Sequence, residues 1–113
     1  MKQEIAELWA ADLESNPPQA FGTLKTHPTQ DGPPGHCVVG RLCELHAQAT
    51  NSVWMDDGRF FRYFGMSGCA EITVAIWAGL SSQGEGKVMR LNDAERLSFP
   101  EIAKFIRENW ESL

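Results

Sequence analysis

Apolar residues recur at helical spacing near the start of the chain. Ile5, Leu8, Trp9 and Leu13 share one face of residues 3–14, and acidic residues occupy the opposite face. The sequence "SNPP" follows, and Pro17 disfavours helical backbone at the residue before it. The pattern therefore predicts an amphipathic helix over residues 3–14.

The same spacing returns at the end of the chain, with a start signal. Ser98 and Glu101 have the S-x-x-E spacing of a capping box, and Pro100 is tolerated in a first helical turn. The residues that line one face of this predicted helix are Phe99, Ile102, Ala103, Ile106 and Trp110.

A third helix is predicted over residues 36–48. Val39, Leu42, Cys43 and His46 share one face, and we expect His46 to be partly exposed at the helix end. Gly40 costs about 1 kcal/mol in a helix interior, so we expect it to allow close packing by another element. Before this helix, residues 20–26 read as a short strand and residues 27–35, rich in Pro and Gly, as a loop.

Aromatic and β-branched residues over 52–65 predict a β-hairpin that turns at Asp57-Gly58. Residues 68–80 are ambiguous, because alternation favours a strand and the spacing of Ile72, Ala75 and Ile76 fits a helix. Residues 81–86 read as a loop and 87–91 as a strand. These elements predict a single α+β domain over 1–113, with three or four helices packed on a small antiparallel sheet.

Composition excludes several classes of protein. Fifteen Asp and Glu against ten Lys and Arg give a net charge of −5, which disfavours nucleic-acid binding and suits a partner with a basic surface. There is no signal-peptide pattern and no apolar run long enough to span a membrane. Three cysteines, an odd number, then predict a cytoplasmic protein with free thiols and no cofactor.

The stretch "GHCVVGRLCELH", residues 35–46, is the main candidate for chemistry. Cys37 near a helix N-terminus, with His36 or His27 as a base, would suit a cysteine-dependent enzyme or a ligand-binding module. Cys43 and His46, three residues apart, could share a metal ion, but no close Cys pair completes a zinc site. The simpler interpretation is that the cysteines are small apolar residues of the core, so we expect no catalytic or metal site.

The predicted hairpin is the main candidate for an interface. Alternation along its strands would bury one face and leave aromatic side chains on the other. Exposed aromatics beside arginines are typical of interface hot spots. The candidate interface residues are Trp54, Arg59, Phe61, Arg62 and Tyr63.

Three segments, "LWAADLESNPPQAFGTLKT", "GHCVVGRLCELH" and "LNDAERLSFPEIAKFIRENW", resemble a family of small uncharacterised phage, plasmid and actinobacterial proteins. Its members have a Trp in the first helix, a Gly-x-Leu strand, a C-x-x-G-x-L-C-x-L helix, and L-N-D followed by S-F-x-E-I-A. The matching residues are Trp9, Gly22, Leu24, Cys37, Gly40, Leu42, Cys43, Leu45, Leu91, Asn92, Asp93, Ser98, Phe99, Glu101, Ile102 and Ala103.

The resemblance implies that residues 70–80 form a helix ending in W-x-G-L, and it supplies no catalytic residues to transfer. The Pro/Gly loop and the DDG hairpin depart from the family pattern. A phage or mobile-element setting implies a non-enzymatic binding protein that occludes a host protein, for example a defence component such as a CRISPR effector.

Overall fold

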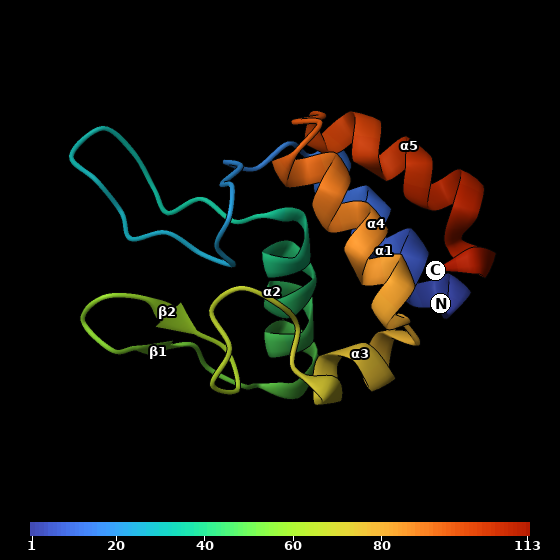
Figure 1. Ribbon diagram of the computed structural model, residues 1–113. Helices are drawn as coiled ribbons and strands as arrows, with labels where there is room; N and C mark the ends of the chain where they lie inside the picture. The colour runs from blue at the N-terminus through green and yellow to red at the C-terminus, as the bar shows by residue number, and fades with distance from the viewer.

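The computed structural model describes residues 1–113 as five α-helices and one two-stranded antiparallel sheet (Figure 1). The elements are α1 (Gln3–Glu14), α2 (Val38–Thr50), β1 (Met55–Asp56), β2 (Phe61–Arg62), α3 (Ile72–Ala78), α4 (Ser82–Asp93), α5 (Phe99–Asn109) and a 3₁₀ turn, η1 (Trp110–Ser112). The α+β class is confirmed, but the predicted number of helices is wrong, since there are five rather than three or four.

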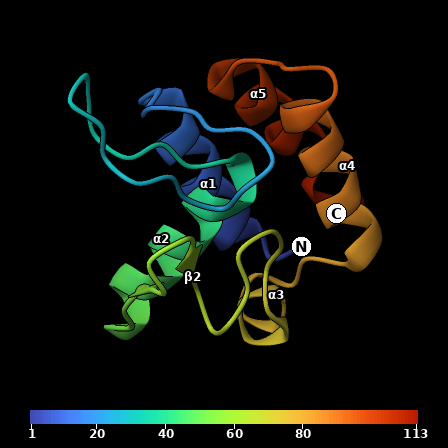
Figure 2. The ribbon, with the colours of Figure 1, turned by 60° about the vertical axis from the view of Figure 1, so that its left-hand side comes forward.

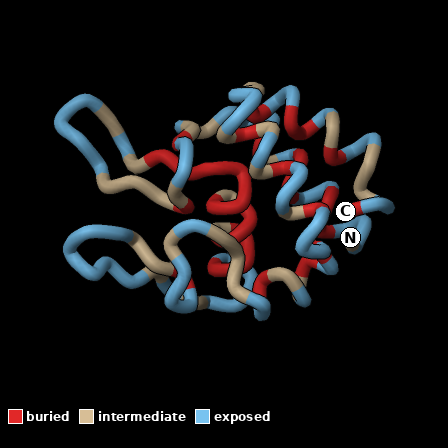
Figure 3. The backbone as a smooth tube through the Cα atoms, viewed as in Figure 1, coloured by how far each residue is buried: buried red, intermediate tan, exposed pale blue.

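Helix α2 runs through the middle of the molecule. Helices α1, α4 and α5 lie on one side of it, and the Pro/Gly loop and the β1–β2 hairpin lie on the other (Figures 1 and 2). Figure 3 shows that α2 is buried along most of its length. Trp9 of α1 is fully buried, and its indole N–H donates to the carbonyl oxygen of Val38 at 3.0 Å. This contact fixes the predicted first helix against the start of α2.

Gly40 allows the close packing that its place in a helix suggests. The backbone of Leu24 passes so near that a Cβ on Gly40 would lie 1.8 Å from the Leu24 carbonyl oxygen. Residues 20–26 form no regular strand, contrary to the prediction. Lys25 makes only an isolated bridge to His36, because the side of the segment facing α2 meets a helix end instead of another strand.

The predicted capping box of α5 is confirmed. The Ser98 hydroxyl accepts from the Glu101 N–H, and the Glu101 carboxylate accepts from the Ser98 N–H. Residues 72–78 form a helix, as the resemblance implies. Its N-cap is Glu71, whose carboxylate accepts from the Thr73 N–H at 2.8 Å, and Gly79 ends it with a φ of 68°.

The predicted loop at 81–86 and strand at 87–91 are wrong, because both segments belong to α4. Ser81 caps this helix by accepting the Gly84 N–H at 2.9 Å. Gly84 lowers helix propensity, but it packs where a Cβ would lie 2.8 Å from the Leu113 Cα. Tertiary packing therefore selects a helix that local composition disfavours.

Candidate functional site

The hairpin turns one residue later than predicted. Met55 pairs with Arg62 and Asp56 with Phe61, and the Asp57 N–H donates to the Phe60 carbonyl oxygen at 3.1 Å. The two central residues are thus Gly58 and Arg59. Gly58 has a φ of 90°, in the region that favours glycine, and the Phe60 N–H donates to the Asp57 carboxylate at 2.7 Å.

This register places Trp54, Phe61 and Tyr63 on the inner face of the hairpin, because directly paired residues project to the same side. Tyr63 is fully buried, so the expectation that it is an exposed interface residue is wrong. Its hydroxyl lies 2.6 Å from Nδ1 of His46. Trp54 is partly buried, and its indole N–H donates to the Glu44 carboxylate at 3.0 Å.

The inner face also holds the Pro/Gly loop against the hairpin. His27 stacks on Phe61 with ring centroids 4.5 Å apart, and its Nε2 lies 3.0 Å from Oδ1 of Asp56. Lys25 lies over both Trp54 and Phe61, with Nζ 5.2 and 4.7 Å from the ring centroids. Trp54 and Phe61 are therefore engaged within the molecule.

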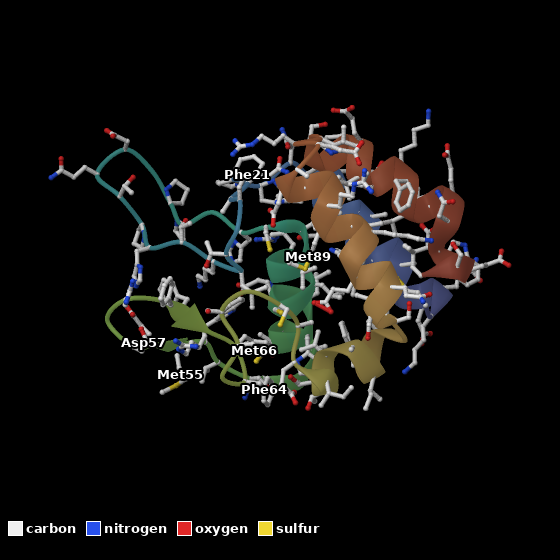
Figure 4. All side chains as sticks on the ribbon, viewed as in Figure 1. Phe21, Met55, Asp57, Phe64, Met66 and Met89 are labelled. Carbon is white, nitrogen blue, oxygen red and sulfur yellow. The ribbon has the colours of Figure 1, made fainter.

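The outer face of the hairpin, which we define as Val53, Met55, Phe60 and Phe64, carries the exposed apolar side chains. Val53 is 73% exposed and Met55 is 64% exposed. Three of these four residues line a hollow of about 310 Å³ together with Ser52 and Gly65. They are Val53, Met55 and Phe64. Figure 4 shows Met55 and Phe64 along the same lower edge of the molecule.

Phe64 is held outward by an unusual backbone conformation. The Tyr63 N–H donates to the Met66 carbonyl at 2.8 Å, and the Met66 N–H donates to the Tyr63 carbonyl at 3.1 Å. The two residues between them have positive φ values, 48° for Phe64 and 83° for Gly65. Asn or Asp is typical at the first of these positions, and an aromatic residue there costs about 1 kcal/mol.

Helix α3 continues the exposed apolar surface. Ile72 and Ile76, one helical turn apart, are 65% and 67% exposed. The helix lies beside the 63–66 turn, because Trp77 and Phe64 both contact the imidazole of His46, with centroids 5.1 and 5.8 Å away. Seven of the nine exposed large apolar residues of the chain fall between positions 53 and 76. This concentration makes residues 53–76 the candidate interaction surface of the chain.

His46 packs beneath this surface, in contact with Phe64 and Trp77. It is buried, contrary to the expectation that it is partly exposed at the helix end. The cause is that the hairpin and α3 cover the end of α2. Burial lowers the pKa of His46 below its ordinary value of 6.5. The neutral imidazole therefore joins the hairpin to α3 at neutral pH.

Cys37 and Cys43 are buried, as the core interpretation predicts, whereas Cys69 is partly exposed. Cys37 is the N-cap of α2, and its Sγ accepts the Gly40 N–H at 3.3 Å. Burial raises the pKa of the Cys37 thiol to about 11 and raises that of Cys43 as well. Being near a helix N-terminus thus does not activate Cys37, because desolvation of the thiolate outweighs the effect of the backbone N–H groups.

The structure does not bring the imidazoles to this thiol. Nε2 of His36 lies 3.0 Å from the Glu44 carboxylate, and this hydrogen bond lowers the pKa of Glu44 despite burial. His27 faces Asp56 instead. No three His, Cys, Asp or Glu side chains form a group that could hold a metal ion, and Nδ1 of His46 faces the Tyr63 hydroxyl.

Comparison of the chain with protein-family models, with curated proteins and with solved structures gives no match. None of its helices combines the length and the apolar content required to cross a membrane.

Proposed function

We propose that the protein is a non-enzymatic binding protein that occludes a surface of another protein with the hairpin outer face and the adjoining Ile72 and Ile76 of α3. The observation that carries this proposal is the gathering of exposed apolar side chains on these two neighbouring elements. Large apolar side chains placed around a hollow are the usual anchors of a protein interface.

A strained backbone at an exposed side chain supports the same proposal. Phe64 occupies a turn position where Asn would be more stable, and the residue remains 48% exposed. Strain of this kind persists at binding and switch sites when the surrounding structure maintains it. The fold thus holds an aromatic ring in water at a cost in stability.

The alternative is a cysteine-dependent enzyme or ligand-binding module centred on Cys37. It has less support, because the thiol is buried, its pKa is raised to about 11, and neither His36 nor His27 is hydrogen-bonded to it. A thiol in this state is protonated at neutral pH and is a poor nucleophile.

The resemblance to phage and plasmid proteins suggests that the occluded protein belongs to a host cell. A host defence component, such as a CRISPR effector, and a cytoplasmic location stay predictions. The net charge of −5 would favour approach to a host surface that is basic overall.

The proposal is tested with a pair of matched substitutions of exposed phenylalanines. Tagged wild-type protein, Phe64→Asn and Phe21→Asn are used to recover proteins from candidate host cells. Phe21 is 39% exposed and lies away from the hairpin, beside Arg96. We expect a partner that is retained by wild type and Phe21→Asn and lost with Phe64→Asn. Equal recovery by all three proteins would refute the proposed surface.

A further inference from the structure

The outer strand of the hairpin has a free edge. The sheet has two strands, so β1 and β2 each have one edge without a neighbouring strand (Figure 1). The backbone groups of Trp54 make no hydrogen bond within the protein, and the pairing register turns those of Asp56 away from β2. An unpaired strand edge of this kind can accept an extended chain from another protein.

The register shows which groups face outward. In an antiparallel pair, positions that exchange backbone hydrogen bonds alternate with positions that do not. The Asp57 N–H bonds to Phe60 across the hairpin, so the Asp56–Phe61 pair is of the second kind and the Met55–Arg62 pair is of the first. The backbone groups of Asp56, and by the same alternation those of Trp54, therefore point away from β2. On β2 the outward groups of Tyr63 are hydrogen-bonded to Met66, which leaves only those of Phe61, so β1 has the longer free edge.

The charge on this part of the molecule differs from that of the whole chain. Arg59 is exposed and makes no ion pair, and its guanidinium lies 5.2 Å over the ring of Phe60. Arg62 lies 5.8 Å over the same ring and donates to the Asp57 carboxylate and to the Gly65 carbonyl oxygen. The Asp57 carboxylate is paired with Arg62 and the Asp56 carboxylate with His27, so Arg59 is the charged side chain of the hairpin that has no ionic partner.

We infer that the partner contributes an extended acidic segment, which pairs with the free edge of β1 through Trp54 and Asp56. Alternate apolar side chains of the segment enter the hollow beside Val53, Met55 and Phe64, and a carboxylate lies near Arg59. Alternation follows from the edge geometry, since every second residue of an added strand projects to the outer face. This inference rests on the proposed function and adds the conformation and charge of the partner segment.

The test uses a random linear peptide library displayed on phage and selected on the wild-type protein. We expect selected peptides with apolar residues at every second position and an Asp or Glu placed to reach Arg59. With such a peptide bound, the amide protons of Trp54 and Asp56 should exchange with solvent at least about tenfold more slowly. Methylating alternate peptide nitrogens should abolish binding in one register and preserve it in the other, because only every second N–H faces β1.

Charge reversal supplies the second variant. Arg59→Glu should weaken binding of the acidic peptides by about tenfold. Selection of basic peptides, selection of apolar residues at helical spacing, or no enrichment would overturn the inference. If acidic peptides bind Phe64→Asn as well as wild type, the proposed function fails. If they require Phe64 but leave exchange at Trp54 and Asp56 unchanged, only the strand-pairing inference fails.

Discussion

Replacing Gly40 with Ala tests how α2 is held in the centre of the fold. The new Cβ would lie 1.8 Å from the Leu24 carbonyl oxygen and 2.8 Å from the Leu24 carbonyl carbon. A van der Waals contact needs more than about 3 Å, so the helix and the Leu24 backbone must separate by about 1 Å. Both atoms that would be met belong to the backbone, so no side chain can rotate away. Two hydrogen bonds of Leu24 would also be weakened, from the Cys37 N–H at 3.3 Å and to Ser67 at 2.8 Å.

We expect Gly40→Ala to lower the free energy of unfolding by about 3 kcal/mol. Overpacking contributes about 2 kcal/mol and the two hydrogen bonds about 1 kcal/mol each, offset by about 1 kcal/mol of helix propensity. Urea denaturation followed by circular dichroism measures the change. Gly86→Ala in α4 is the control, because nothing lies within 4 Å of its new Cβ, and it should stabilise the protein by up to about 1 kcal/mol. Equal urea midpoints for Gly40→Ala and wild type would refute this account of the packing.

Three further predictions concern the hairpin, pH and the thiols. Both Phe64→Asn and Phe64→Ala lose the ring contacts, but Asn tolerates positive φ better than Ala does. Phe64→Asn should therefore be about 1 kcal/mol more stable than Phe64→Ala in urea denaturation, and equal stability would contradict the strain at this turn. Because burial lowers the pKa of His46, the unfolded state binds a proton first as pH falls. The free energy of unfolding should therefore be constant above about pH 7 and decline below the ordinary pKa of 6.5, and His46→Gln should remove this decline. Urea midpoints that stay flat across this range for wild type would contradict the burial of the imidazole. A thiol reagent should label Cys69, which is partly exposed, in the native protein and should label Cys37 and Cys43 only after denaturation; native labelling of Cys37 would revive the enzyme alternative.

Helices whose pattern and packing agree could be predicted from sequence. In α5 the capping box and the apolar face act together, and in α1 the periodicity and the stop at Pro17 coincide. Helix α4 could not be predicted, because Gly84 and Gly86 lower its local propensity. Gly84 packs against Leu113, which is distant in sequence, so the pattern of residues around Gly84 cannot predict this contact.

The hairpin was predictable as an element, but its exposed face was not. The predicted interface contained Trp54, Phe61 and Tyr63, which the register places on the inner face. Alternation alone leaves two choices of exposed face, and the aromatic residues on both strands do not decide between them. The positions of Val53 and Met55 could have decided which face is exposed. They flank Trp54 in the sequence, so they must lie on the face opposite to it.

We propose above all that the hairpin outer face binds another protein. The most direct test is the dissociation constant for the partner recovered with the wild-type protein, measured by titration calorimetry for wild type, Met55→Lys and Leu8→Lys. Leu8 is 45% exposed on α1 and serves as the control. Burying a charge at an anchor should weaken binding about a hundredfold for Met55→Lys, with Leu8→Lys unchanged. Equal affinity for Met55→Lys and wild type would contradict the claim.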